Sequence, residues 1–215
     1  MREMLFAIAT VLALTGATPV LAQAPAPAPA PPPATVHPNP LTVGPDDRIL
    51  GKADAPITVI EYASMTCPHC AHFSVDVLPT LKQNWIDTGK AKLVLRDYPL
   101  DDPALRAAMI ARCAPPDKFY GLAETFFADQ KQWVLSTDYK TALARLALLG
   151  GITKAQFDAC LADKAVEDKV LQSRLIATQQ LGVDSTPTFF INGTKFDGAP
   201  ELDALDAALK RAAGS

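Results

Sequence analysis

The stretch EYASMTCPHCAHF, from Glu61 to Phe73, places Cys67 and Cys70 three positions apart, with a proline and His69 between them. Such a pair can ligate a metal, form a structural disulfide or act as a redox-active dithiol. A metal site would use both cysteines, His69 and His72, but consecutive donors on one helical turn point in divergent directions. No second cluster of such ligands occurs in the sequence, so a primary role in binding zinc or copper is disfavoured.

The elements around this motif favour redox chemistry. A short β-branched apolar run over 56–64 predicts a buried strand, and from Pro68 onward apolar residues recur at helical spacing. Cys67 therefore stands at a helix N-terminus, where unpaired N–H groups and the helix dipole favour a thiolate. Cys70 lies one turn inside and is more shielded. His69 could add a donor or positive charge beside the Cys67 sulfur.

The remaining pattern predicts a second strand, a long helical region and a final hairpin. Pro79 should kink the helix after the motif, Thr153 and Gln156 form a capping box, and Asn192-Gly193 predicts a type I′ turn between two short strands. The second strand is expected over 92–100, and helices are expected from Asp102 to before Pro115-Pro116, over 117–130, 138–149, 154–162 and 166–181, and around Leu202, Leu205 and Leu209.

The N-terminus predicts export. Arg2 precedes an apolar run over 4–17 and the small residues VLAQA, so residues 1–22 read as a signal peptide cleaved after Ala22 or Ala24, with an uncleaved membrane anchor as the alternative. An exported protein meets an oxidising compartment. Residues 23–45 form a Pro/Ala-rich linker expected to be an extended spacer.

The composition bounds the partners and the fold class. A net charge of −3 without a Lys/Arg cluster argues against nucleic acid, and 49% apolar residues among 215 allow a buried core. The element order predicts an α/β fold in which residues 46–101 and 182–215 form one sheet with helices on both sides. Residues 102–181 interrupt it as an all-helical insertion.

The paired segments ADAPITVIEYASMTCPHC and GVDSTPTFFING, separated by a helical insertion, resemble the DsbA family of periplasmic thiol:disulfide oxidoreductases over residues 46–213. The resemblance implies a thioredoxin-like fold with an inserted all-helical domain and no cofactor. It implies that Cys67 is the nucleophile, Cys70 the resolving cysteine and Glu61 a buried acid beneath the site. A desolvated carboxyl has a raised pKa and can exchange a proton with Cys70.

The resemblance also implies roles for residues far from the motif. Thr186-Pro187 resembles the loop that faces the cysteine pair, where the proline is cis and the Thr186 backbone pairs with an extended substrate. Some members of the family have a second disulfide in the helical insertion, which favours a structural Cys113–Cys160 bond. Two buried free thiols are the alternative.

We therefore expect a monomeric periplasmic oxidase that introduces disulfides into exported cysteine-bearing proteins through Cys67 and Cys70, and that a DsbB-like membrane protein reoxidises. The protein would be tethered to the inner membrane if the signal peptide stays uncleaved. The alternative is a disulfide isomerase or reductase kept reduced by a DsbD-like partner. A non-catalytic metal or peptide carrier is a third class, and it would tolerate loss of Cys67.

Overall fold

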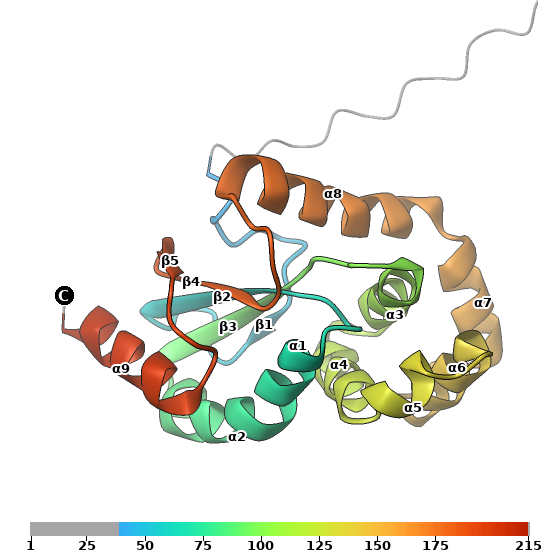
Figure 1. The fold of residues 1–215 in the computed structure, drawn as a ribbon, viewed down its shortest axis with the longest axis horizontal. Coiled ribbons are helices and arrows are strands. Elements are labelled where there is room, and N and C mark those ends of the chain that lie inside the picture. The colour runs from blue at the N-terminus through green and yellow to red at the C-terminus, as the bar shows by residue number, and fades with distance from the viewer. Residues whose placement is uncertain (1–38, 215) are drawn as a thin grey trace, which may run out of the picture. The chain divides into compact units, whose positions relative to one another are not determined.

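The computed structural model describes residues 39–214, and in this part of the chain five strands form one mixed sheet in the order β1-β3-β2-β4-β5 (Figure 1). β2 and β3 run parallel at its centre, and the other neighbouring strands are antiparallel. The strands are β1 (Ile49–Leu50), β2 (Ile57–Ala63), β3 (Ala91–Asp97), β4 (Thr188–Ile191) and β5 (Thr194–Phe196). The predicted signal peptide and the predicted spacer up to residue 38 lie outside the described residues.

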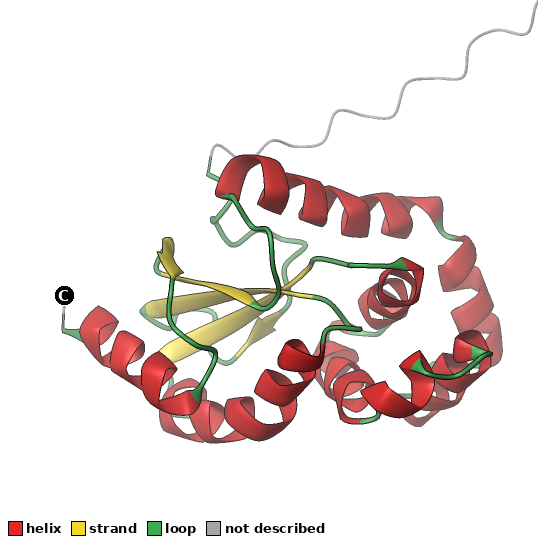
Figure 2. Ribbon diagram, viewed as in Figure 1, coloured by secondary structure: helices red, strands yellow, loops and turns green. Residues whose placement is uncertain are grey.

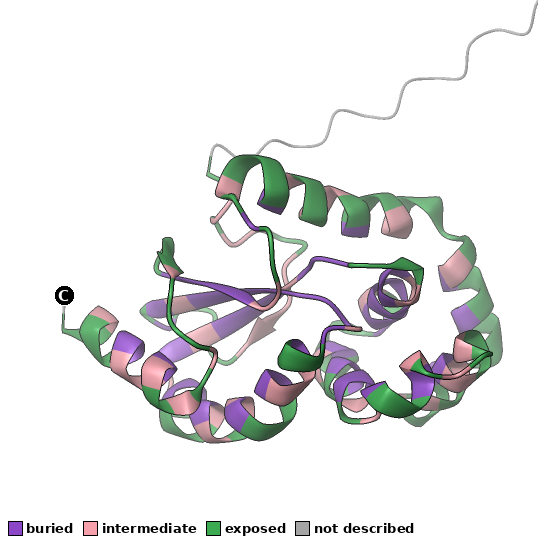
Figure 3. Cartoon of the chain, in the orientation of Figure 1, coloured by how far each residue is buried: buried purple, intermediate pink, exposed green. Residues whose placement is uncertain are grey.

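The two central strands are the ones predicted from their apolar runs. In β2 every residue except Thr58 is buried, and β3 is buried along most of its length (Figure 3). Central strands covered on both faces have near-continuous apolar sequences, which explains why they stand out. β1 has only two residues and no detectable periodicity, so it was not predicted.

One face of the sheet is covered by α9 (Leu202–Ala213) and by the helical stretch after the Cys motif (Figure 1). That stretch consists of α1 (Pro68–His72), η1 (Phe73–Val77), α2 (Leu78–Leu81) and η2 (Lys82–Ile86), where η1 and η2 are π-helical. Pro79 lacks an N–H, and a proline ring crowds the carbonyl four residues back. A wide turn precedes it, in which the Leu78 N–H bonds to the Phe73 carbonyl five residues back.

The opposite face is covered by α8 (Lys164–Leu181), which also belongs to the helical region (Figure 2). Ala177 packs with sheet residues such as Ile60, whereas Val170 packs in the core of the helical region. α8 therefore packs against both the sheet and the core of the helical region. The other helices of this region are α3 (Asp102–Cys113), η3 (Pro116–Lys118, a 3₁₀ turn), α4 (Phe119–Ala128), α5 (Gln130–Val134), α6 (Tyr139–Leu149) and α7 (Lys154–Ala162).

The element ends follow the predicted signals. Thr153 and Gln156 form the capping box at the start of α7, as predicted, and this prediction is confirmed. Asn192 (φ 46°) and Gly193 (φ 83°) both have positive φ in a two-residue turn between β4 and β5, so the type I′ hairpin is confirmed as well. Between residues 39 and 214, no helix has both the length and the apolar character needed to cross a membrane.

Ordered packing begins earlier than the expected start at Asp46. Leu41 and Val43 lie against the core on the α8 side of the sheet, and the Arg96 guanidinium donates to the carbonyls of Pro40 and Thr42. The last residues of the expected linker, 39–45, are therefore held by the sheet. The proline-rich composition did not predict this ordered packing, because the contacts come from an arginine on β3, more than fifty residues away.

Candidate active site

Cys67 lies where β2 gives way to α1. The strand ends at Ala63, a short loop follows, and Cys67 is the N-cap residue of α1 with Pro68 at the first helical position. Proline suits that position because the missing N–H has no helical partner there. Cys67 is 5% exposed and Cys70 is 0% exposed, and both are free thiols. The motif thus presents one sulfur at the helix start and a second fully covered one.

The two thiols have opposite acidities. The pKa of Cys67 is lowered to about 5, chiefly by a hydrogen bond from the Cys70 thiol. Burial opposes this, while the Thr186 side chain and the backbone N–H groups of Cys70 and His69 add to it. The pKa of Cys70 is raised, first by burial and then by its bond to Cys67 and the charge of Glu61. Cys67 is thus a thiolate at neutral pH and Cys70 a thiol.

Glu61 supplies a buried carboxyl on β2 that interacts electrostatically with Cys67 and Cys70. It is 3% exposed, and its Oε1 has no hydrogen-bond partner among the described residues. Its cross-strand neighbours are Leu95 and Phe189, which cannot solvate a charge. Burial, and secondly the charge on Cys67, raise the pKa of Glu61 to about 8. The carboxyl is therefore mostly protonated at neutral pH and can give or take a proton there.

The loop before β4 meets Cys67 at one end of the sheet, because β4 runs antiparallel to β2 and begins beside the end of β2. The Cys67 thiol donates to the Thr186 carbonyl oxygen, with sulfur and oxygen 3.2 Å apart. The Thr186–Pro187 peptide bond is cis, the conformation that the resemblance implied. The Thr186 hydroxyl is buried and makes no hydrogen bond to another described residue. Strand order explains the meeting, because β4 pairs directly with β2, at whose end Cys67 lies.

The family model described as Thioredoxin matches residues 44–211. This chain belongs to the thioredoxin family. Within the family it is DsbA-like: it is 34% identical to alpha-DsbA1 of Wolbachia pipientis, with a TM-score of 0.75 over 81% of this chain and 94% of that chain. The predicted thioredoxin-like fold with a helical insertion is confirmed.

Two curated relatives of this thioredoxin-family chain have names that refer to disulfide chemistry. A Rickettsia bellii protein, whose name refers to a protein-disulfide oxidoreductase, is 32% identical over 168 residues, which are 78% of this chain and 64% of the relative. This chain therefore spans less than two thirds of that protein. A Bacillus cereus protein, whose name refers to disulfide bond formation protein D, is 30% identical over 75% of this chain and 76% of its own length.

The second cysteine pair of this thioredoxin-family chain lies outside the active site. Cys113, the last residue of α3, forms a disulfide with Cys160 on α7, with their Cα atoms 6.2 Å apart. This is the pairing that the resemblance implied, and it fastens two helices of the insertion. Among residues 39–214, no group of three or more His, Cys, Asp or Glu side chains could hold a metal ion.

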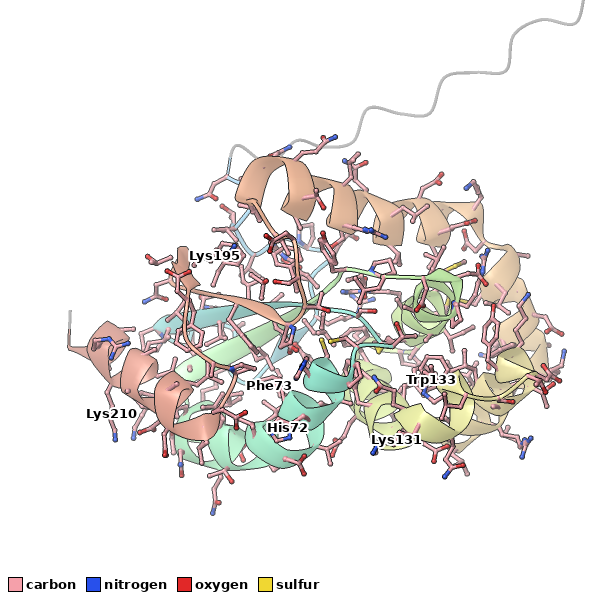
Figure 4. The ribbon with its side chains drawn as sticks, in the orientation of Figure 1. His72, Phe73, Lys131, Trp133, Lys195 and Lys210 are labelled. Atoms are coloured by element: carbon pink, nitrogen blue, oxygen red, sulfur yellow. A yellow bond between two sulfur atoms is a disulfide. The ribbon has the colours of Figure 1, made fainter. Side chains whose placement is uncertain are left out.

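The side chain of His69 was expected to add a donor or a positive charge beside the Cys67 sulfur, and this stays a prediction. The residue is exposed, and its backbone N–H is what reaches the Cys67 sulfur. In the part of the chain that the structure describes, the imidazole has no hydrogen-bond partner. The next histidine, His72, bonds to Asp76 and Glu201 on the helix surface (Figure 4).

Two polar residues that the sequence did not single out, Gln130 in the insertion and Asp101 just before it, contact the loop that carries Cys67. Gln130, the first residue of α5, donates from Nε2 to the carbonyls of Met65 and Cys67. Asp101, the N-cap residue of α3, accepts a hydrogen bond from the Thr66 hydroxyl. Neither residue has a sequence signal for this role, because a glutamine in a helix and an aspartate before one are ordinarily explained by the surface and by capping.

Proposed function

We propose that this chain is a protein thiol:disulfide oxidoreductase that acts through Cys67 and Cys70. The observation that carries the proposal is the pairing of a Cys67 thiol whose pKa is about 5 with a fully buried Cys70 thiol whose pKa is raised. A stable thiolate next to a buried thiol is the arrangement that dithiol–disulfide exchange needs. The names of the relatives from Rickettsia and Bacillus support the same reaction.

Oxidation of a substrate would proceed in two exchanges. A substrate thiolate attacks the Cys67 sulfur of the Cys67–Cys70 disulfide, a new disulfide joins substrate to Cys67, and Cys70 leaves as a thiolate. A second substrate thiolate then attacks the substrate's own sulfur in that bond, and Cys67 leaves. The substrate gains a disulfide and loses two protons, while the two cysteines gain two electrons.

Glu61 would supply the proton that the Cys70 sulfur takes up in the first exchange. The departing Cys70 thiolate is buried, so it needs a proton at once, and Glu61 is a buried acid whose pKa is about 8. The Glu61 carboxyl gives that proton to Cys70 and recovers one from solvent. Cys67 needs no proton on release, because its thiolate is the stable form at neutral pH.

The Thr186-Pro187 loop would hold the substrate chain against the sulfur. Cys67 and the Thr186 carbonyl already lie within hydrogen-bond distance, so an extended substrate paired with the Thr186 backbone would bring its cysteine to the Cys67 sulfur. Pro187 fixes the backbone of this loop, which is why we include it with the catalytic residues.

The stabilised thiolate favours the oxidase direction. Any interaction that stabilises the reduced form makes the disulfide form a stronger oxidant. We propose exported, cysteine-bearing proteins as substrates, the periplasm as the compartment and a DsbB-like membrane protein as the reoxidant of a monomeric enzyme. A disulfide isomerase or reductase is the second candidate. The redox state of Cys67 and Cys70 in cells separates the two: mostly oxidised for the oxidase, mostly reduced for the other.

The test is covalent trapping of substrates. Cys70→Ser removes the resolving thiol, so mixed disulfides between Cys67 and exported proteins should accumulate and appear on non-reducing gels. Pro187→Ala should trap them as well, since it perturbs the loop that faces the sulfur. Cys67→Ser is the matched control and should trap nothing. Absence of adducts with both trapping variants, in a protein that keeps its fold, would reject the exchange reaction and leave the carrier class.

A further inference from the structure

The side chain of Gln130 is buried at the junction between the helical insertion and the active-site loop. It is 6% exposed, and its Nε2 atom donates to the carbonyl oxygens of Met65 and Cys67 at 2.9 and 3.0 Å. Burying an amide is unfavourable unless it is hydrogen-bonded, and both Nε2 donors are bonded here. Gln130 begins α5, the helix that also carries Lys131 and Trp133, both labelled in Figure 4.

The Cys67 carbonyl lies at the junction between the loop and the first turn of α1. It accepts the Ala71 N–H at 3.1 Å, which is the first hydrogen bond of the helix, while the Cys67 N–H donates to Ser64. The peptide plane that carries this carbonyl therefore links the loop to the helix. Its orientation sets how the Cys67 side chain faces the N–H groups of the first turn. Met65, two residues earlier, gives the same amide a second point of attachment on the loop.

The core of the insertion reaches the same loop. Ala63, Met65, Cys67 and Cys70 pack in one apolar cluster with residues of α3, α4 and α6. Apolar packing fixes the position of this junction but not the rotation of a peptide plane, since it is non-directional. Within the described residues, the Gln130 amide is the side chain that donates to the Cys67 carbonyl.

We propose that Gln130 is a positioning residue for the nucleophile: its amide holds the Cys67 peptide so that the sulfur faces the N–H groups of His69 and Cys70 and the Thr186 loop. The inference rests on the proposed function and deepens it, because it makes the helical insertion part of the redox centre. The insertion would thereby set how strongly the protein oxidises its substrates, through one side chain.

The test compares Gln130→Met with Gln132→Met in the full chain. Methionine matches glutamine in length and lacks the donor. Gln132 lies on the same helix but is exposed, so its variant controls for the substitution itself. We measure thiolate absorbance of the reduced proteins against pH and their equilibria with glutathione. Loss of these hydrogen bonds should leave the Gln130→Met thiolate roughly threefold to tenfold less populated below its midpoint, and the disulfide a weaker oxidant by the same factor.

A structural role alone would give a different result. Gln130→Met would then unfold at a lower temperature but keep the wild-type thiolate titration and glutathione equilibrium, and this outcome overturns the proposal. If Gln130→Met does not fold, Gln130→Glu is judged in its place. Its protonated acid can still donate to one carbonyl at low pH, whereas its carboxylate cannot donate. Its thiolate titration should therefore be displaced to higher pH than that of the wild type, and an unchanged titration again overturns the proposal.

The proposed function has its own readout in the same experiment. The oxidoreductase function would be rejected if Cys67 of the wild-type protein ionises at low pH but the protein exchanges no disulfides with protein substrates. The titration of Gln130→Met would still decide whether the glutamine positions the sulfur. A wild-type protein with an ordinary thiol would overturn both.

Discussion

The Cys67 sulfur lies 3.2 Å from the backbone carbonyl oxygen of Thr186, although the two residues are 119 positions apart in the chain. A carbonyl accepts a hydrogen bond from a thiol but repels a thiolate. Thr186 also carries a buried hydroxyl without a partner among the described residues, and its side chain lowers the pKa of Cys67. One residue therefore offers an acceptor to the protonated sulfur and a donor to the ionised one.

Thr186→Val should raise the pKa of Cys67. Valine has nearly the same shape and keeps the carbonyl, but it removes the hydroxyl that can donate to the thiolate. A hydrogen bond to a charged group contributes about 1.5–3 kcal/mol, so we expect a rise of about one to two pKa units. Thiolate absorbance against pH measures it. Thr194→Val, at an exposed site on β5, is the control, and equal titration curves for both variants would contradict the role.

Cys67 and Glu61 give the stability of the reduced protein opposite pH dependences. The pKa of Cys67 falls from its ordinary 9.0 to about 5 on folding. The stabilisation that its ionisation adds to the free energy of unfolding is therefore complete above pH 9.0, the pKa in the unfolded chain, and is lost as pH falls through 5. The pKa of Glu61 rises from 4.5 to about 8 on folding. The stabilisation that its protonated form adds to the free energy of unfolding is therefore complete below pH 4.5 and is lost as pH rises through 8. Between pH 5 and 8 the two slopes oppose each other.

The oxidised protein should therefore lose stability from pH 5 to 8, while the reduced protein changes little. Oxidation removes the titration of Cys67, but the burial of Glu61 remains and is the larger cause of its raised pKa. The slope cannot exceed about 1.4 kcal/mol per pH unit for one proton. Urea unfolding at several pH values measures it in both redox forms. Glu61→Gln should flatten the curve of the oxidised protein, and parallel curves for the two redox forms would contradict the assignment.

Removing the Cys113–Cys160 disulfide should destabilise the helical insertion without stopping exchange at Cys67. The bond closes a loop with a sequence separation of 47, which corresponds to roughly 4 kcal/mol in the chain-entropy model. We expect the Cys113→Ser/Cys160→Ser variant to lose about 2–4 kcal/mol of unfolding free energy. Denaturant unfolding under oxidising conditions measures this. A variant as stable as the wild type would show that the bond does not constrain the unfolded chain.

Alkylation checks the pairing itself. In protein treated with mild reductant, Cys67 and Cys70 should be labelled, while Cys113 and Cys160 stay blocked. Mass spectrometry of the labelled peptides distinguishes the four sites. Labelling of Cys113 and Cys160 in protein that has met no reductant would rule out the bond.

Local signals explain what the sequence predicted. The strand–Cys motif–helix order, the caps of the later helices and the Asn192-Gly193 turn each depend on neighbouring residues, and the structure has them. The burial of Gln130 could not be predicted from the sequence, because it depends on how the helical insertion packs on the loop. The ordered segment before Asp46 was missed for the same reason, since it depends on the distant Arg96.

The side chain of His69 provides the remaining test of the motif. Its ring is exposed, and the contacts that lower the pKa of Cys67 come from Cys70, Thr186 and backbone N–H groups. A protonated ring at the helix start would add long-range positive charge, which solvent screens to a fraction of a kcal/mol, roughly 0.3–1. His69→Ala should therefore raise the pKa of Cys67 by less than about one unit and weaken the oxidant slightly. His72→Ala, an exposed histidine already bound to carboxylates, is the control. If His69→Ala removes the whole depression, the backbone donors do not carry it; if it matches the control, the ring has no part in it.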